Sequence, residues 1–295
     1  MMIFDIKRAS ASDGPGLRSV VFFKGCPLRC AWCHNPESYS ASPQLSYAEE
    51  KCVSCGKCSQ ICEHGCHEIK NGAHIYSSEK CVLCGKCAEE CPTKALKLYG
   101  EEISVDRVFS KLLRDKAYYV FGGGVTFSGG EPMSQFEEAL ELAKKLYEAG
   151  VSVCMESCGY GNTEDFLEIA KYIDFFLFDV KCVKELHKRC TGVENDLIIK
   201  NLHALSDAGA KIILRCPIIP GVNDNKEHLE YLASLSKLSG VKEINLEPYH
   251  PIGISKRKIL GMPVEYGNPE FADKTEIENL KKQLSVLTDK DIKII

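Results

Sequence analysis

The feature that most constrains this chain of 295 residues is a doubled run of cysteines. The first run, spaced C-x2-C-x2-C-x3-C, consists of Cys52, Cys55, Cys58 and Cys62; the second, 29 residues later, consists of Cys81, Cys84, Cys87 and Cys91. Gly-Lys precedes the third cysteine of each run, and Pro92 follows the second run. Residues 46–100 are rich in turns and poor in apolar segments, so we predict a small insert held together by bound metal.

Four closely spaced thiolates are typical of cubane iron–sulfur clusters, and the doubled run resembles that of bacterial two-cluster ferredoxins. There the first three cysteines of a run hold one cluster and the fourth ligates the other. Zinc is the alternative, but it usually takes separated C-x2-C pairs. We therefore predict two 4Fe–4S clusters. The fourth ligand of the first run stays open between two residues: Cys62, which aligns with Cys91 and is favoured, and Cys66, which aligns with Ala95.

A third cysteine group has a different spacing. Cys26, Cys30 and Cys33 form C-x3-C-x2-C, with Trp32 directly before the last cysteine. Three thiolates leave one iron of a cubane without a protein ligand, and therefore open to a small molecule. Open coordination positions distinguish catalytic from structural metal sites, as they do for zinc. The spacing thus predicts a catalytic cluster.

Composition and charge exclude several other classes. The N-terminus lacks the apolar segment of a secretory signal, so the 17 cysteines do not indicate a secreted disulfide scaffold. No apolar run is long enough for a membrane helix. With 37 basic and 41 acidic residues, the net charge of -4 does not point to nucleic acid. We expect a cytoplasmic protein with reduced thiols and no membrane or nucleic-acid partner.

The remaining chain, residues 1–45 and 101–295, alternates between strand-like and helix-like segments. The predicted strands are 19–24, 124–127, 151–156, 175–180, 211–216 and 241–247, and DIKII at the C-terminus is a candidate for another. The predicted amphipathic helices are 135–149, 163–172, 196–208 and 226–238. Such alternation indicates an α/β fold with a parallel sheet or an open barrel.

Polar residues gather where these strands end. They are the 25–33 segment, Ser128–Pro132 (SGGEP), Glu156 with Ser157, Asp179 with Lys181, Arg215, and Glu247–His250 (EPYH). In β/α barrels the site is assembled from several carboxyl ends of strands at once. Six coincident strand ends therefore predict one site.

These motifs resemble a known family. The C-x3-C-x-aromatic-C group and GGEP (Gly129–Pro132) resemble the two common motifs of the radical S-adenosylmethionine (SAM) superfamily. The segment Asp13–Glu37 resembles the activating enzymes of glycyl radical enzymes, in the subgroup with a two-cluster ferredoxin-like insert; DVK (Asp179–Lys181) and YHPIG (Tyr249–Gly253) also match. The resemblance implies a partial (β/α)6 radical SAM barrel with that insert.

The resemblance also implies the activity. The cluster of Cys26, Cys30 and Cys33 would bind SAM and cleave it reductively to methionine and a 5′-deoxyadenosyl radical. That radical would remove a hydrogen from a glycine Cα of a partner glycyl radical enzyme. Implied with it are three 4Fe–4S clusters in all, an electron donor such as flavodoxin or ferredoxin, and a monomeric state. No residue is expected to act as a general acid or base.

Residue roles follow from the same resemblance. The SAM-binding set would be Trp32, Cys33, His34, Gly129, Gly130, Glu156, Asp179, Val180, Lys181 and His250. Trp32, His34 and His250 would contact the adenosine, the two glycines would let backbone approach the methionine amino group, and Asp179 and Lys181 would serve the ribose and carboxylate. Glu156 and Asp179 could also seat a monovalent cation.

Two other interpretations stay open. One is a radical SAM enzyme with auxiliary clusters that acts on another substrate, such as a protein maturase or a small-molecule dehydrogenase; such enzymes usually carry their extra cysteines after the barrel. The other, an electron-carrier ferredoxin with an attached domain, leaves Cys26–Cys33 without a role. Candidate partners include lyases for choline or isethionate, a diol or hydroxyproline dehydratase, and an arylacetate decarboxylase.

Overall fold

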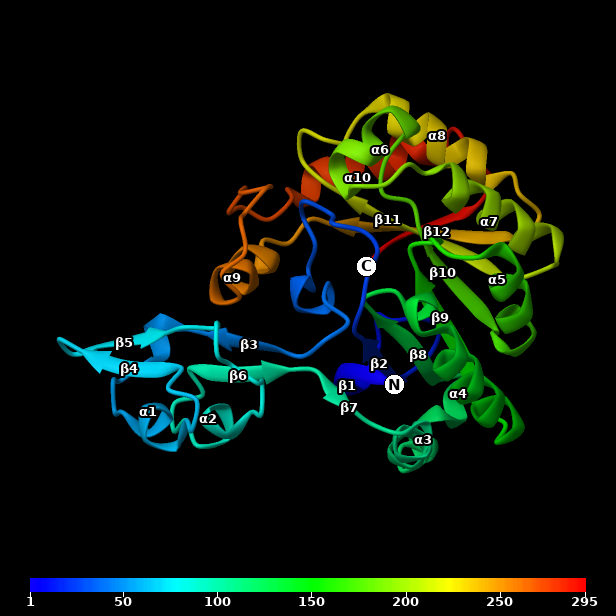
Figure 1. The fold of residues 1–295 in the computed structure, drawn as a ribbon. Helices are drawn as coiled ribbons and strands as arrows, with labels where there is room; N and C mark the ends of the chain where they lie inside the picture. Colours follow the sequence, from blue (N-terminus) through cyan, green and yellow to red (C-terminus); the bar gives the residue numbers. More distant parts are fainter.

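The fold is built on one large sheet, seen in a computed structural model that describes residues 1–295. Its nine strands have the order β13-β12-β11-β10-β9-β8-β2-β1-β7 (Figure 1). The strands are β1 (Met2–Ser10), β2 (Arg18–Phe23), β7 (Glu101–Glu102), β8 (Gly124–Gly129), β9 (Ser152–Ser157), β10 (Phe175–Asp179), β11 (Ile212–Ile218), β12 (Val241–Pro248) and β13 (Asp291–Ile294). From β2 to β13 all neighbours are parallel, whereas β1 pairs antiparallel with β2 and β7. The carboxyl ends of seven strands therefore meet at one edge.

Eight helices surround this sheet, most of them on its outside and one, Ile252–Ile259, at the edge where the parallel strands end (Figure 1). They are α3 (Val105–Leu113), α4 (Phe136–Glu148), α5 (Thr163–Ile169), α6 (Lys184–Thr191), α7 (Asp196–Asp207), α8 (Lys226–Ser236), α9 (Ile252–Ile259) and α10 (Lys274–Ser285). Their apolar faces and the sheet form one core of 48 buried residues. None of the helices is both long enough and apolar enough to cross a membrane.

The predicted parallel sheet is confirmed. All six predicted strands are present within two residues of their expected ends, and DIKII forms β13. The alternation of apolar and helical segments predicted these elements because each strand is buried on both faces. Strand β1 was missed, since its exposed face carries charged residues and it pairs antiparallel at the margin of the sheet. Helices α3, α6, α9 and α10 were also missed, and of these α6 and α9 are short and polar and lack an apolar pattern.

Residues 44–99 form a separate unit that projects from the sheet (Figure 1). Strand β3 (Gln44–Tyr47) pairs antiparallel with β6 (Leu96–Tyr99), and β4 (His67–Lys70) pairs with β5 (Ala73–Tyr76). The short helices α1 (Lys57–Ile61) and α2 (Lys86–Glu89) each contain the third cysteine of one run. An offset of 29 residues maps β3 onto β5 and β4 onto β6, with the same cross-strand register. The cysteine repeat is thus also a structural repeat.

Candidate active site and metal centres

A pocket lies at the carboxyl ends of the parallel strands. Of the residues predicted for the site, it is lined by Cys26, Cys30, Trp32, Cys33, His34, Gly129, Gly130, Glu156, Asp179 and Lys181. Two predicted residues do not line it. Val180 is buried, with its N–H bonded to the carbonyl of Arg215, and His250 lies beside the pocket. The convergence of six segments at one pocket is what the strand-end pattern predicted.

The cysteine loop that follows β2 is held from several sides. The N–H groups of Arg29 and Ala31 donate to carbonyls of α6, at Thr191 (2.7 Å) and Cys190 (3.0 Å). The carbonyl of Cys30 accepts from the Tyr39 hydroxyl and from the Arg257 guanidinium, each at 2.8 Å. Sequence reasoning missed Tyr39 and Arg257, because neither belongs to a motif and Arg257 reaches the loop from α9, 227 residues away. These contacts fix the loop without using the thiols.

The donor chemistry of this loop fits an iron cluster. Burial raises the pKa of the Cys30 and Cys33 thiols, so their thiolates need a neighbouring positive charge. Iron supplies that charge when three thiolates bind it. A fourth thiol, Cys158, is buried and packs against Cys26. The N–H of Cys158 donates to the carboxylate of Glu131 at 2.7 Å. Cys158 was not predicted; its place at the end of β9 was the available signal.

The two glycines of SGGEP are required by backbone packing. A Cβ on Gly130 would lie 2.3 Å from the carbonyl oxygen of Gly25, and a Cβ on Gly129, whose φ is +102°, would lie 2.7 Å from the backbone of Phe23. The sequence analysis assigned these glycines to a close approach of the methionine amino group. The structure adds another reason, because both glycines let the end of β8 pack against β2 and the start of the cysteine loop.

Charged side chains at the strand ends form two linked groups. Lys181 Nζ donates to Asp179 Oδ2 at 2.8 Å. Arg215 Nη2 lies 3.6 Å from Glu156 Oε1 and also pairs with Glu247, whose pKa burial raises to about 7. Glu156 and Asp179 thus each have a positively charged side chain beside them. The monovalent cation expected between these two carboxylates stays a prediction. Buried groups of both signs suit a charged ligand such as the amino and carboxylate groups of an amino acid.

Aromatic side chains form the outer wall of the pocket. Burial lowers the pKa of His34 to about 4, so this ring is neutral at pH 7. The His250 ring lies 6.1 Å from the His34 ring and 4.4 Å from that of Phe271. Trp32 lines the pocket and is otherwise buried in the core. Flat rings at the rim can stack on a nucleoside base.

The projecting unit contains two more thiol-lined pockets. One is lined by Cys52, Cys55, Cys58 and Cys91, and the other by Cys62, Cys66, Cys81, Cys84 and Cys87. The fourth cysteine of each run therefore faces the first three of the other run, as in the ferredoxin arrangement. Both Cys62 and Cys66 line the second pocket. Two histidines, His74 in the first pocket and His67 in the second, were not predicted.

Comparison with known families identifies the superfamily of the chain. The profile of the radical SAM superfamily matches residues 20–232, a span that contains the cysteine loop and SGGEP. The chain belongs to the radical SAM superfamily. Membership of this superfamily implies a 4Fe–4S cluster and SAM, and Cys26, Cys30 and Cys33 remain the predicted cluster ligands.

Whole-length relatives narrow the assignment. The chain is 40% identical over 283 residues to the choline trimethylamine-lyase activating enzyme of Oleidesulfovibrio alaskensis, covering 92% of this chain and 91% of that one. It is 39% identical to the trans-4-hydroxy-L-proline dehydratase activating enzyme of Clostridioides difficile, covering 95% of both chains. It is 37% identical to the indoleacetate decarboxylase activating enzyme of Tractidigestivibacter scatoligenes, covering 95% and 92%. This radical SAM enzyme is therefore an activating enzyme of glycyl radical enzymes.

Solved structures support the fold of the radical SAM enzyme. SuiB of Streptococcus suis, bound to its precursor peptide SuiA, aligns with a TM-score of 0.56 at 12% identity, covering 94% of this chain and 48% of SuiB. A radical SAM methyltransferase of Sphaerobacter thermophilus aligns with a TM-score of 0.55 at 11% identity, covering 94% and 66%. At these identities the likeness concerns the fold alone.

Proposed function

We propose that this activating enzyme acts on a glycyl radical enzyme of the kind named for its relatives, whose partners are a choline lyase, a hydroxyproline dehydratase and arylacetate decarboxylases. The observation that carries the proposal is the pocket itself. It brings three cysteines, two motif glycines and the Asp179–Lys181 pair to one face of the sheet. The SAM-bound cluster supplies one-electron chemistry that yields methionine and a 5′-deoxyadenosyl radical.

The residues of the pocket hold and orient the ligand. Cys26, Cys30 and Cys33 hold the cluster, and Lys181 provides a partly buried ammonium for the methionine carboxylate. His34 and Trp32, with His250 at the rim, provide flat rings for the adenine. A primary alkyl radical reacts with almost any nearby C–H bond, so orientation is the main catalytic task. The rigid loop contacts from Tyr39 and Arg257 serve that task.

We also propose that residues 46–100 hold two further 4Fe–4S clusters. Support comes from the two crossed thiol pockets, which pair Cys91 with the first run and Cys62 with the second. The second cysteine of each run, Cys55 and Cys84, is exposed, which suits exchange of electrons with a donor such as flavodoxin or ferredoxin. The working form is a cytoplasmic monomer that docks both the donor and the glycyl radical enzyme.

Anaerobic reconstitution tests the proposal. The native chain, reduced in the presence of SAM, is expected to form 5′-deoxyadenosine and to contain about twelve iron atoms, four for each cubane. The Cys30→Ala chain is expected to form none and to keep about eight iron atoms. Formation of 5′-deoxyadenosine by Cys30→Ala at the native rate would contradict the site, and four iron atoms in the native chain would contradict the two-cluster insert.

A further inference from the structure

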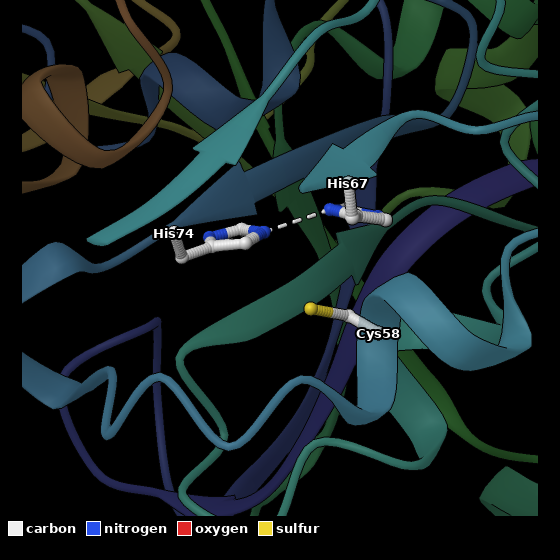
Figure 2. Close-up of side chains that lie close together, drawn as sticks. All are labelled: Cys58, His67 and His74. Carbon is white, nitrogen blue, oxygen red and sulfur yellow. Dashed lines mark hydrogen bonds between the residues drawn. The ribbon is translucent and has the colours of Figure 1, made fainter. Parts of the chain in front are cut away.

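Two buried histidines lie between the thiol pockets of the projecting unit. His67 Nδ1 and His74 Nε2 share a hydrogen bond of 3.0 Å, and the rings are stacked with an interplanar angle of 23° (Figure 2). His67 is 4% exposed to solvent and His74 is 9% exposed. Figure 2 shows the Cys58 thiol pointing toward the pair, and the three ligand-type atoms lie within 4.8 Å of one another. The pair is not part of the proposed ligand set.

The two histidines stand at positions where the 29-residue repeat does not conserve the residue type. Tyr47 and Tyr76 are 29 residues apart, and each lies near the first cysteine of a run, Cys52 or Cys81. The same offset places Leu96 at the position of His67 and a second leucine at the position of His74.

That second leucine is Leu45, which lines the pocket of the second run where His74 lines the pocket of the first. Each pocket therefore has one histidine, and the two histidines occupy positions that the repeat does not relate. A polar pair therefore occupies two positions whose equivalents in the backbone repeat are leucines. Burial of two imidazoles where leucines fit costs stability unless their nitrogen atoms have partners.

The hydrogen bond between the rings gives the two histidines different roles, one as donor and one as acceptor. A bond between two ring nitrogens needs one N–H and one lone pair, so the pair has a donor end and an acceptor end. His74 Nδ1 is buried and has no protein partner. The pocket that His74 lines contains four cysteines, whose thiolates only accept hydrogen bonds. Facing thiolates, this nitrogen is satisfied only as an N–H, and in that tautomer His74 Nε2 accepts and His67 Nδ1 donates.

We propose that the His67–His74 pair donates a hydrogen bond from His74 Nδ1 to a sulfur atom of the cluster held by Cys52, Cys55, Cys58 and Cys91. This inference rests on the proposed two-cluster insert. His67 is a positioning residue, because its N–H fixes the tautomer of His74.

The consequence is an inequality between two clusters with the same ligand spacing. A hydrogen bond to a cluster sulfur stabilises the reduced state, and hydrogen bonds of this kind are among the determinants of iron–sulfur potentials. The cluster beside His74 thus has a higher potential than it would have with leucines at these two positions. An electron on the insert rests on the cluster of Cys52, Cys55, Cys58 and Cys91.

The test compares reduction potentials in the full reconstituted chain. The informative variant is the double substitution His67→Leu with His74→Leu, because Leu45 and Leu96 show that leucine fits the equivalent positions. His74→Asn keeps an N–H at the place of Nδ1, and His203→Leu, on the exposed side of α7, is the matched control. Potentiometric titration followed by electron paramagnetic resonance gives the potential of each auxiliary cluster. Pulsed measurements in D2O detect an exchangeable proton at the cluster.

We expect one auxiliary cluster of the double variant to shift to lower potential and to lose its coupling to an exchangeable proton. His74→Asn should restore both toward the native values, and His203→Leu should change neither. Native potentials and native proton coupling in a double variant with full iron would overturn the inference while leaving the proposed function intact. Loss of iron from both the double variant and His74→Asn would also overturn it, since the histidine would then be a ligand or a packing residue. About four iron atoms in the native chain would instead refute the two-cluster insert itself.

Discussion

The backbone of Gly130 packs directly against the backbone of Gly25, so that a Cβ on Gly130 would lie 2.3 Å from the Gly25 carbonyl oxygen. The N–H of the next residue, Glu131, donates to that same oxygen at 2.8 Å. The second motif and the cysteine loop are thus one packed unit. Gly130 thus supports the start of the cysteine loop, in addition to the role in SAM binding that we predict for it.

This packing predicts the effect of Gly130→Ala. The methyl group has to displace the start of the cysteine loop, so both the iron of this cluster and the rate of 5′-deoxyadenosine formation are expected to fall, the latter by about tenfold or more. Gly267→Ala is the control, because a Cβ there meets its nearest atom at 3.7 Å. Native iron and activity in Gly130→Ala would show that the loop tolerates the shift.

Substitution of Lys181 is expected to weaken SAM binding without loss of iron. Lys181→Met removes the ammonium that pairs with Asp179 and leaves the three cysteines in place. A hydrogen bond to a charged group contributes about 1.5–3 kcal/mol, so SAM affinity should fall by about 10- to 100-fold at unchanged iron content. Equilibrium binding of SAM to the reconstituted variant measures this. Native affinity would place the methionine carboxylate elsewhere.

The contacts of Cys62 and Cys66 favour Cys62 as the fourth cluster ligand of the first cysteine run. The N–H of Cys66 donates to Cys62 Sγ at 3.3 Å. Although burial raises the pKa of Cys62, hydrogen bonds from Cys66 and His64 lower it overall, whereas burial and the contact with Cys62 raise the pKa of Cys66 to about 11. The thiolate is the form that binds metal, so Cys62 is the expected ligand.

Iron analysis and Mössbauer spectra of the two alanine variants test this choice. Cys62→Ala should lose or degrade one auxiliary cluster, and Cys66→Ala should keep about twelve iron atoms. Loss of iron in Cys66→Ala alone would reverse the assignment.

Titration of Glu247 is expected to make the free energy of unfolding depend on pH. Burial raises its pKa to about 7 in the folded chain, against about 4.3 in an unfolded chain. The folded state therefore binds the extra proton between these values, and its stabilising effect is present below about pH 4 and lost as the pH rises through 7. Denaturation of the cluster-free chain from pH 5 to pH 8 should show the native protein losing on the order of 2 kcal/mol relative to Glu247→Gln. Parallel pH profiles would contradict the raised pKa.

The parallel strands and the three cysteine groups could be predicted from the sequence because each has a signal within a short segment of the chain. Buried parallel strands are short apolar runs, and cysteine spacing records which thiols share a loop. The contacts of Arg257 with Cys30, and of Gly253, whose Cβ would lie 2.2 Å from the carbonyl of Cys33, join residues that are distant in sequence. The His67–His74 pair was missed because neither histidine belongs to a motif. Only the register of β4 and β5 brings the two together.

The central claim is that SAM cleavage at Cys26, Cys30 and Cys33 places a radical on a glycine of a partner protein. Electron paramagnetic resonance tests it most directly, with the reduced native chain, SAM and each candidate partner: a choline lyase, a hydroxyproline dehydratase and an arylacetate decarboxylase. The account predicts a glycine-centred signal on one of these partners and no signal with Cys30→Ala. Formation of 5′-deoxyadenosine with every partner, but a glycine-centred signal with none, would contradict it and favour a radical SAM enzyme that acts on another substrate.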